Sequence, residues 1–143
     1  MATFPGQYPH YKSVDALTKQ YLFLPGVKPV QVPHTLAAGL QVLPGTVLGR
    51  ITATGLLTPC VKTASDGSQN PYGINTTYLD STATGPQGAS APLNFALTVW
   101  AYVNSAELVI DPSWGSTPDA AWLAIEPSLR FAGIFGRAPI YSR

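Results

Sequence analysis

The sequence is poor in charged residues. Of its 143 residues, 8 are Lys or Arg and 7 are Asp or Glu, which gives 10% charged residues and a net charge of +1. A soluble domain ordinarily carries about 25% charged residues. The surface must therefore be covered either by uncharged polar residues, Gly and Pro, or by another protein. The first case describes a neutral secreted β domain, and the second describes a subunit of an assembly.

Runs of basic residues and long apolar stretches are also missing. The basic residues are scattered from Lys12 to Arg143, whereas binding to nucleic acid through phosphates needs a basic stripe. The longest apolar runs fall far short of a membrane span, and the first residues do not read as a signal peptide. We expect a protein that is made in a cytoplasm and binds neither nucleic acid nor membrane.

Cysteine is nearly absent, since Cys60 is the only one. A single cysteine excludes an intrachain disulfide and a zinc site built from several cysteines. Its apolar neighbours, Pro59 and Val61, indicate a small buried thiol. No metal-ligand spacing or phosphate-binding loop occurs. We therefore expect no metal and no cofactor.

The residues for nucleophilic catalysis are equally sparse. The conceivable set is Cys60, His34 and Asp66, and most β domains offer such a combination. Turn capping accounts for Asp66, which precedes a glycine. We predict no catalytic residues and no enzyme activity.

What the sequence does contain is a series of short strands between turn residues. Strands are predicted over residues 30–32, 40–43, 47–52, 56–62, 73–79 and 93–103, with a loop over 81–92. In the last strand, Phe95, Leu97 and Val99 share one face, and Ala96, Thr98, Trp100 and Tyr102 share the other. Two bulky faces predict a strand covered on both sides, within the domain or at a subunit contact. Structural turns are predicted at Gly45, Gly49, Gly55, Asp66, Gly67 and Gly73.

The C-terminal part predicts a helix. Residues 116–119 combine a hydroxyl cap, Pro118 in the first turn and Asp119 near the positive end of the helix dipole. Pro127 predicts that this helix ends at about Glu126. A second turn over 128–132 should then end at Gly133. An edge strand is expected from residues 134–135 and 140–141.

Residues 1–33 read as an extended arm, and residues 34–143 as the folded domain. Prolines at 5, 9, 25, 29 and 33 favour extended backbone. Apolar residues suited to burial on a partner are interleaved among them: Phe4, Tyr8, Tyr11, Tyr21, Leu22, Phe23 and Leu24. The alternative is that residues 21–24 pack on their own domain. Together, these elements predict an α/β fold of the β-rich α+β kind, a single small domain with one or two short C-terminal helices.

Four large aromatic residues are candidates for an interface: Trp100, Tyr102, Trp114 and Trp122. Aromatic residues dominate both cores and interfaces. A carbohydrate-binding platform formed by Trp114 and Trp100 is the alternative.

Several segments resemble a known family. They are residues 45–52, the turn at Asp66 and Gly67, residues 72–74 leading to 79–80, residues 101–108, and residues 129–134. In this order and spacing they are similar to the head decoration proteins of tailed bacteriophages, the lambda type. The resemblance covers roughly residues 30–135, and residues 81–94 and 111–118 look like insertions.

The resemblance implies a capsid decoration, or cement, protein. Such proteins form homotrimers on the outer surface of the expanded phage head, at three-fold positions. There they stabilise the lattice of the major capsid protein against DNA pressure, and an N-terminal arm becomes ordered on the capsid. Two alternatives remain open at this point: another structural module of a virion or tail, and a carbohydrate-binding β domain.

Overall fold

The computed structural model describes residues 22–24 and 28–137. The strands are β1 (Val30–Leu36), β2 (Gln41–Val42), β3 (Val47–Arg50), β4 (Leu57–Pro59), β5 (Pro71–Ile74), β6 (Leu79–Asp80), β7 (Leu93–Asn104) and β8 (Ile134–Arg137). The helical elements are the 3₁₀ turns η1 (Ser105–Glu107) and η2 (Pro112–Trp114), and the helix α2 (Pro118–Ala132). The predicted β-rich α+β fold is therefore confirmed. Phe4, Tyr8, Tyr11, Tyr21 and the expected strand at 140–141 lie outside the described residues.

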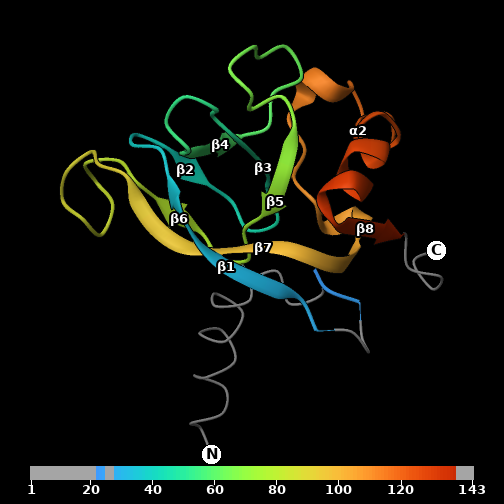
Figure 1. Ribbon diagram of the computed structural model, residues 1–143, viewed down its shortest axis with the longest axis horizontal. Helices are drawn as coiled ribbons and strands as arrows, with labels where there is room; N and C mark the ends of the chain where they lie inside the picture. The colour runs from blue at the N-terminus through green and yellow to red at the C-terminus, as the bar shows by residue number, and fades with distance from the viewer. Residues whose placement is uncertain (1–21, 25–27, 138–143) are drawn as a thin grey trace, which may run out of the picture.

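The main sheet closes on itself. Its strand order is β1-β4-β3-β5-β7-β8, and β1 also pairs with β7. Figure 1 shows β1 and β7 side by side, with α2 at one end of the sheet. The first five strands thus form a small ring, which leaves β8 outside the ring as a neighbour of β7. Ring closure gives each of these five strands a neighbour on both sides for part of its length, and among the described residues β8 keeps one unpaired edge.

The long strand β7 organises this ring. Its first half pairs antiparallel with β1, for example Val32 with Leu97, and its second half pairs parallel with β8, from Ala101 opposite Ile134 to Asn104 opposite Arg137. The sequence predicted this strand well. Its length of 12 residues lets it connect the ring to the helical end of the domain.

The single strand predicted over residues 73–79 is wrong. The chain forms β5, turns, and then forms β6, which pairs with β2 instead of the main sheet. The turn is fixed by the buried side chain of Asn75. Its amide donates to the carbonyls of Leu43 and Thr77, and its oxygen accepts from the N–H of Thr46. These bonds replace strand pairing for the backbone around Asn75.

Two apolar clusters form the core. One lies within the ring and consists of Leu36, Val42, Leu48, Leu57, Leu79 and Leu97. The other lies between the sheet and α2 and consists of Leu22, Val47, Cys60, Ile74, Ala101, Val103, Ile125, Leu129 and Ile134. The second cluster fixes α2 on the face of β7 that carries Ala101 and Val103.

The helix begins where the sequence predicted and ends later. The Thr117 hydroxyl accepts from the N–H of Ala120, Pro118 is the first helical residue, and Gly133 closes the helix with φ of 97°. The predicted end at Glu126 is wrong, because α2 runs through Pro127 to Ala132. Pro127 is exposed, whereas Ile125 and Leu129 on either side are fully buried. Burial of these two side chains outweighs the hydrogen bond that proline cannot donate.

The folded unit extends further toward the N-terminus than residue 34. β1 begins at Val30, so the expected boundary after residue 33 falls inside a paired strand. Residues 22–24 lie along β7, where Leu24 N–H donates to the Tyr102 carbonyl and Asn104 N–H donates to the Leu22 carbonyl. The Leu22 side chain is completely buried in the core. Residues 22–24 therefore pack on their own domain.

Candidate interaction surfaces

Cys60 does not have the properties of a nucleophile. Its side chain is 1% exposed, and its thiol donates to the Gln69 carbonyl at 3.4 Å. Burial raises the pKa of Cys60 to about 12. A thiol with this pKa stays protonated at neutral pH, and the thiolate is the reactive form.

His34 and Asp66 also have separate structural surroundings. The His34 ring packs edge-on against Tyr72 at 5.2 Å between centroids, and burial followed by the charge of Arg50 lowers its pKa. Asp66 accepts from the hydroxyl and the N–H of Ser68, which lowers the pKa of Asp66. Within the described residues, no group of three or more His, Cys, Asp or Glu side chains is placed to hold a metal ion. No helix in this part of the chain is long and apolar enough to cross a membrane.

Of the predicted turn residues, Gly49 and Gly73 lie within strands β3 and β5 and not in turns. Gly67 has φ of 101°, a region that disfavours residues with a Cβ atom. At Gly49 the restriction is space, since a Cβ atom there would lie 2.0 Å from the Ser68 carbonyl oxygen. Positive φ angles also occur at Gly45 and Gly55, and Gly73 lies directly against the Thr98 carbonyl.

An aromatic face lies on the outer side of β7 and β8. It consists of Val30, Trp100, Tyr102 and Phe135. The Trp100 ring lies 5.5 Å from Tyr102 and 6.3 Å from Phe135, and Tyr102 lies 5.3 Å from Phe135. Trp100 is 36% exposed and Tyr102 is 41% exposed. The sequence predicted that both faces of this strand would be covered. On the face that carries Thr98, Trp100 and Tyr102, Thr98 is buried, but the two aromatic rings are exposed to solvent within this single copy.

A second apolar surface lies on the outward side of α2. Leu123, Pro127 and Phe131 follow one another at four-residue spacing, which places them in one row along the helix. Leu123 is 73% exposed and Phe131 is 97% exposed. We call this row the α2 ridge. The nearby charges of Glu126 and Arg130 form an ion pair with each other. The four-residue spacing can be read from the sequence. It was not recognised as one row, because the helix was predicted to end at Glu126, before Pro127 and Phe131.

Trp114 and Trp122, two of the candidate interface residues, pack against the core instead. The Trp114 indole N–H donates to the Cys60 carbonyl at 3.0 Å, and the Lys62 ammonium lies 5.8 Å from the Trp114 ring. The Trp122 ring lies against Gly136. Within the described part of the chain, Trp114 makes no ring contact with Trp100. The two rings therefore do not form a shared platform for a sugar.

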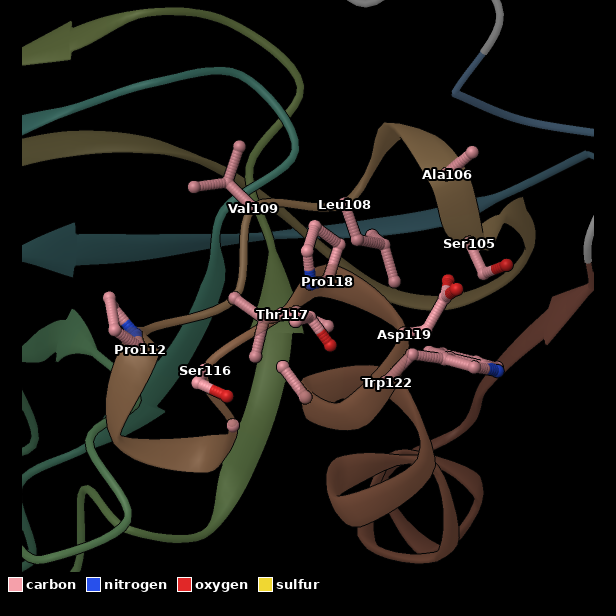
Figure 2. Close-up of a pocket in the computed structure, with 13 residues that line it drawn as sticks. Ser105, Ala106, Leu108, Val109, Pro112, Ser116, Thr117, Pro118, Asp119 and Trp122 are labelled. Atoms are coloured by element: carbon pink, nitrogen blue, oxygen red, sulfur yellow. The ribbon is translucent and has the colours of Figure 1, made fainter.

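A half-open groove lies between the 105–116 segment and the first turns of α2. Its volume is about 560 Å³. Figure 2 shows Leu108, Pro118 and Trp122 along the groove, with Ser105 and Asp119 near its rim. We call it the α2 groove. Its lining is mainly apolar, and the Thr117 hydroxyl is already engaged in capping the helix.

Comparison with known families decides the class of the protein. The family described as bacteriophage lambda head decoration protein D matches residues 30–124. This range begins at the first residue of β1, ends within α2, and covers more than half of the chain.

The chain belongs to this family. The resemblance found in the sequence is thereby confirmed, and the protein is a phage head decoration protein, a structural component of the virion capsid. The family is one of structural proteins and not of enzymes. No curated protein and no solved structure matches the chain significantly. The α2 ridge and β8 lie mostly beyond the matched range, whereas Trp100 and Tyr102 lie within it.

Proposed function

We propose that this head decoration protein binds as a homotrimer at three-fold positions on the outside of the expanded phage head. There it holds neighbouring copies of the major capsid protein together against the pressure of the packaged DNA. The observation that carries this proposal is the family match over residues 30–124. The protein is made in the host cytoplasm and needs no metal, cofactor, nucleic acid or membrane for this role.

The surface chemistry supports assembly. Only 10% of the residues are charged, and the aromatic face and the α2 ridge are exposed apolar surfaces. Burial of a large apolar side chain contributes about 1.5–3 kcal/mol. The two surfaces point to opposite sides, because α2 packs on the face of β7 opposite to Trp100 and Tyr102. One copy therefore has room for two different neighbours, as a protein that joins others requires.

The N-terminal residues provide a further contact in this proposal. Phe4, Tyr8 and Tyr11 bind the major capsid protein, with the chain anchored to its own domain at Leu22. Pro5 and Pro9 restrict the free chain, which lowers the conformational entropy lost on binding. Extended segments of this kind add to sheet edges or place alternate side chains in pockets of a partner.

The first measurement is the mass of the full-length protein in solution. Sedimentation equilibrium should give three times the chain mass of 15.1 kDa. The result should be nearly the same at low and high salt, since an interface poor in charge depends little on ion pairs. A monomer at micromolar concentration would contradict the trimer.

The second measurement is co-sedimentation of the trimer with purified phage heads. We expect saturable binding to expanded heads and little binding to unexpanded heads, together with greater resistance of the decorated heads to heat. Equal binding to both forms would contradict recognition of the expanded lattice. Absence of binding to either form would contradict the capsid role itself.

A further inference from the structure

We propose that the α2 ridge packs against the α2 ridge of a second copy of the chain, with the two helices antiparallel across a two-fold axis. The proposal rests on the proposed function in one respect, namely that the protein is a trimer. A two-fold contact joins a patch to the same patch on one other copy, so it cannot close a ring of three. In a homotrimer the two ridges therefore belong to different trimers, and the contact links one trimer to the next.

The outward side of α2 is suited to packing against another helix. Leu123, Pro127 and Phe131 form an exposed row along it. Ala120 and Ala124, on the same side of the helix, are exposed and small. Rows of side chains at four-residue spacing pack into the grooves of a second helix, with about 8–10 Å between the two axes. The small alanine side chains leave such grooves beside the row, so an identical helix can fit against it.

The charges beside the ridge select the antiparallel direction. Glu126 and Arg130 are the charged residues nearest to Pro127 in the helix, and they form an ion pair within each copy. When two antiparallel helices are centred on Pro127, Glu126 of one copy and Arg130 of the other lie on the same flank. They are then about 3 Å apart along the axis, at a rise of about 1.5 Å per residue.

This arrangement extends the ion pair into a network of four charges. A guanidinium group has several N–H donors, so Arg130 can donate to the Glu126 carboxylate of its own copy and to that of the second copy. Parallel helices related by a two-fold axis would carry the two ion pairs on opposite flanks, where they cannot meet. The surface of α2 is therefore complementary to itself in the antiparallel direction.

The size of the contact predicts where it forms. Each copy contributes one aromatic side chain, which buries about 150–250 Å², and two smaller side chains. A stable interface buries about 1,200–2,000 Å² in total, so the ridge pair is smaller than a stable interface. Free trimers should therefore stay apart at micromolar concentration and associate at millimolar concentration. On a head, trimers held side by side have a high effective concentration, and the ridges pair there.

The first test is a disulfide between two chains. In a Cys60→Ala background, Pro127→Cys places a thiol next to the two-fold axis, where the two Cα atoms come within the limit of about 7 Å for a disulfide. We expect most chains to form a two-chain disulfide on mild oxidation at millimolar concentration. The control is Ala89→Cys, an exposed position in the 81–92 loop, which lies at the other end of the domain from α2 (Figure 1). It should form little disulfide.

Mixing two variants tests the direction of the helices. In the antiparallel register, position 123 of one copy lies opposite position 131 of the other, whereas the two copies of position 123 are about 12 Å apart along the axis. In the Cys60→Ala background, Leu123→Cys and Phe131→Cys should therefore each form little disulfide alone and much more when the two proteins are mixed. Disulfides in each protein alone, with no gain on mixing, would indicate parallel helices and overturn the proposal.

Two further outcomes would also overturn it. Equal disulfide formation by Pro127→Cys and Ala89→Cys would mean that the thiols meet by random collision. Protection of the Pro127→Cys thiol on decorated heads, without a disulfide between chains, would assign the ridge to the major capsid protein. The mass and the head binding of the wild type are measured separately, so failure of ridge pairing is distinguishable from failure of the capsid role.

Discussion

At the scale of single residues, the turn between β4 and β5 shows how closely backbone segments approach each other. Asp66 accepts two hydrogen bonds from Ser68, and the Asp66 carbonyl accepts from the N–H of Thr52. These bonds hold the buried Ser68 directly over Gly49 in β3. The turn therefore covers one side of the ring, and a side chain at position 49 would push it away.

Gly49→Ala should destabilise the protein by about 3 kcal/mol, because the new Cβ atom meets backbone that has little freedom to move. Urea unfolding measures the change. The control is Gly88→Ala, where φ is 70° but no atom lies within 4 Å of the added Cβ. It should cost about 1 kcal/mol, since only the backbone angle is strained. An equal or larger loss in the control would contradict the role of the contact.

Cys60 should make stability depend on pH in the alkaline range. Folding raises its pKa from 9.0 to about 12, so the folded protein holds the thiol proton more tightly than the unfolded chain does. The resulting stabilisation is complete below pH 9.0 and is lost as the pH rises toward about 12. The melting temperature of the wild type should therefore fall more steeply than that of Cys60→Ala between about pH 8 and about pH 10.5. Parallel curves would contradict burial as the source of the shift.

At the scale of secondary-structure elements, α2 contains two prolines in very different positions. Pro118 occupies the first helical position, where its missing N–H has no partner to lose. Pro127 lies in the interior, where it cannot donate to the carbonyl of Leu123. Packing of Ile125 and Leu129 keeps the helix continuous despite this loss.

Pro127→Ala should stabilise the protein by up to about 3 kcal/mol, the difference in helix propensity between the two residues. Thermal unfolding would show a higher melting temperature. Pro118→Ala, in the first turn of the same helix, should change stability by less than about 0.5 kcal/mol. No gain at position 127 would mean that proline is accommodated there without strain.

The sequence predicted what depends on neighbouring residues. Alternation identified β7, and the hydroxyl cap followed by Pro118 predicted where α2 begins. Gly133 was predicted to end a separate second turn, and it is the residue that closes the one continuous helix. The sequence did not predict features that depend on distant contacts. The closure of the ring by β1 and β7, the turn at the buried Asn75 and the passage of α2 through Pro127 all depend on residues far apart in the chain. The α2 ridge was missed for the same reason.

At the scale of the whole molecule, the N-terminal chain joins the domain at a defined point. Leu22 is fully buried with Val103 and Ile134 in the core beneath α2, and residue 23 pairs with Val103. Residues 22–24 are therefore part of the folded domain, although the sequence assigned them to the arm. This distinction decides which truncation tests the proposed capsid contact.

Deleting residues 1–20 should leave the domain folded and reduce binding to expanded heads at least tenfold, because Phe4, Tyr8 and Tyr11 are removed. Circular dichroism and the mass in solution check the fold, and co-sedimentation measures the binding. Deleting residues 1–24 is the matched comparison. It also removes Leu22 and should lower the stability itself by about 2–5 kcal/mol. Undiminished head binding by the shorter deletion would move the contact to the folded domain.

The attachment of residues 22–24 to β7 also has a mechanical consequence. Leu24 N–H and Asn104 N–H bond across this pair, to the carbonyls of Tyr102 and Leu22 respectively. A pull on the preceding chain along the direction of β7 loads both bonds together, in shear, and passes the force to a strand of 12 residues that pairs with β1, β5 and β8. A pull away from the sheet breaks the bonds one after the other. Tension along the capsid surface and tension away from it would therefore meet very different resistance in this protein.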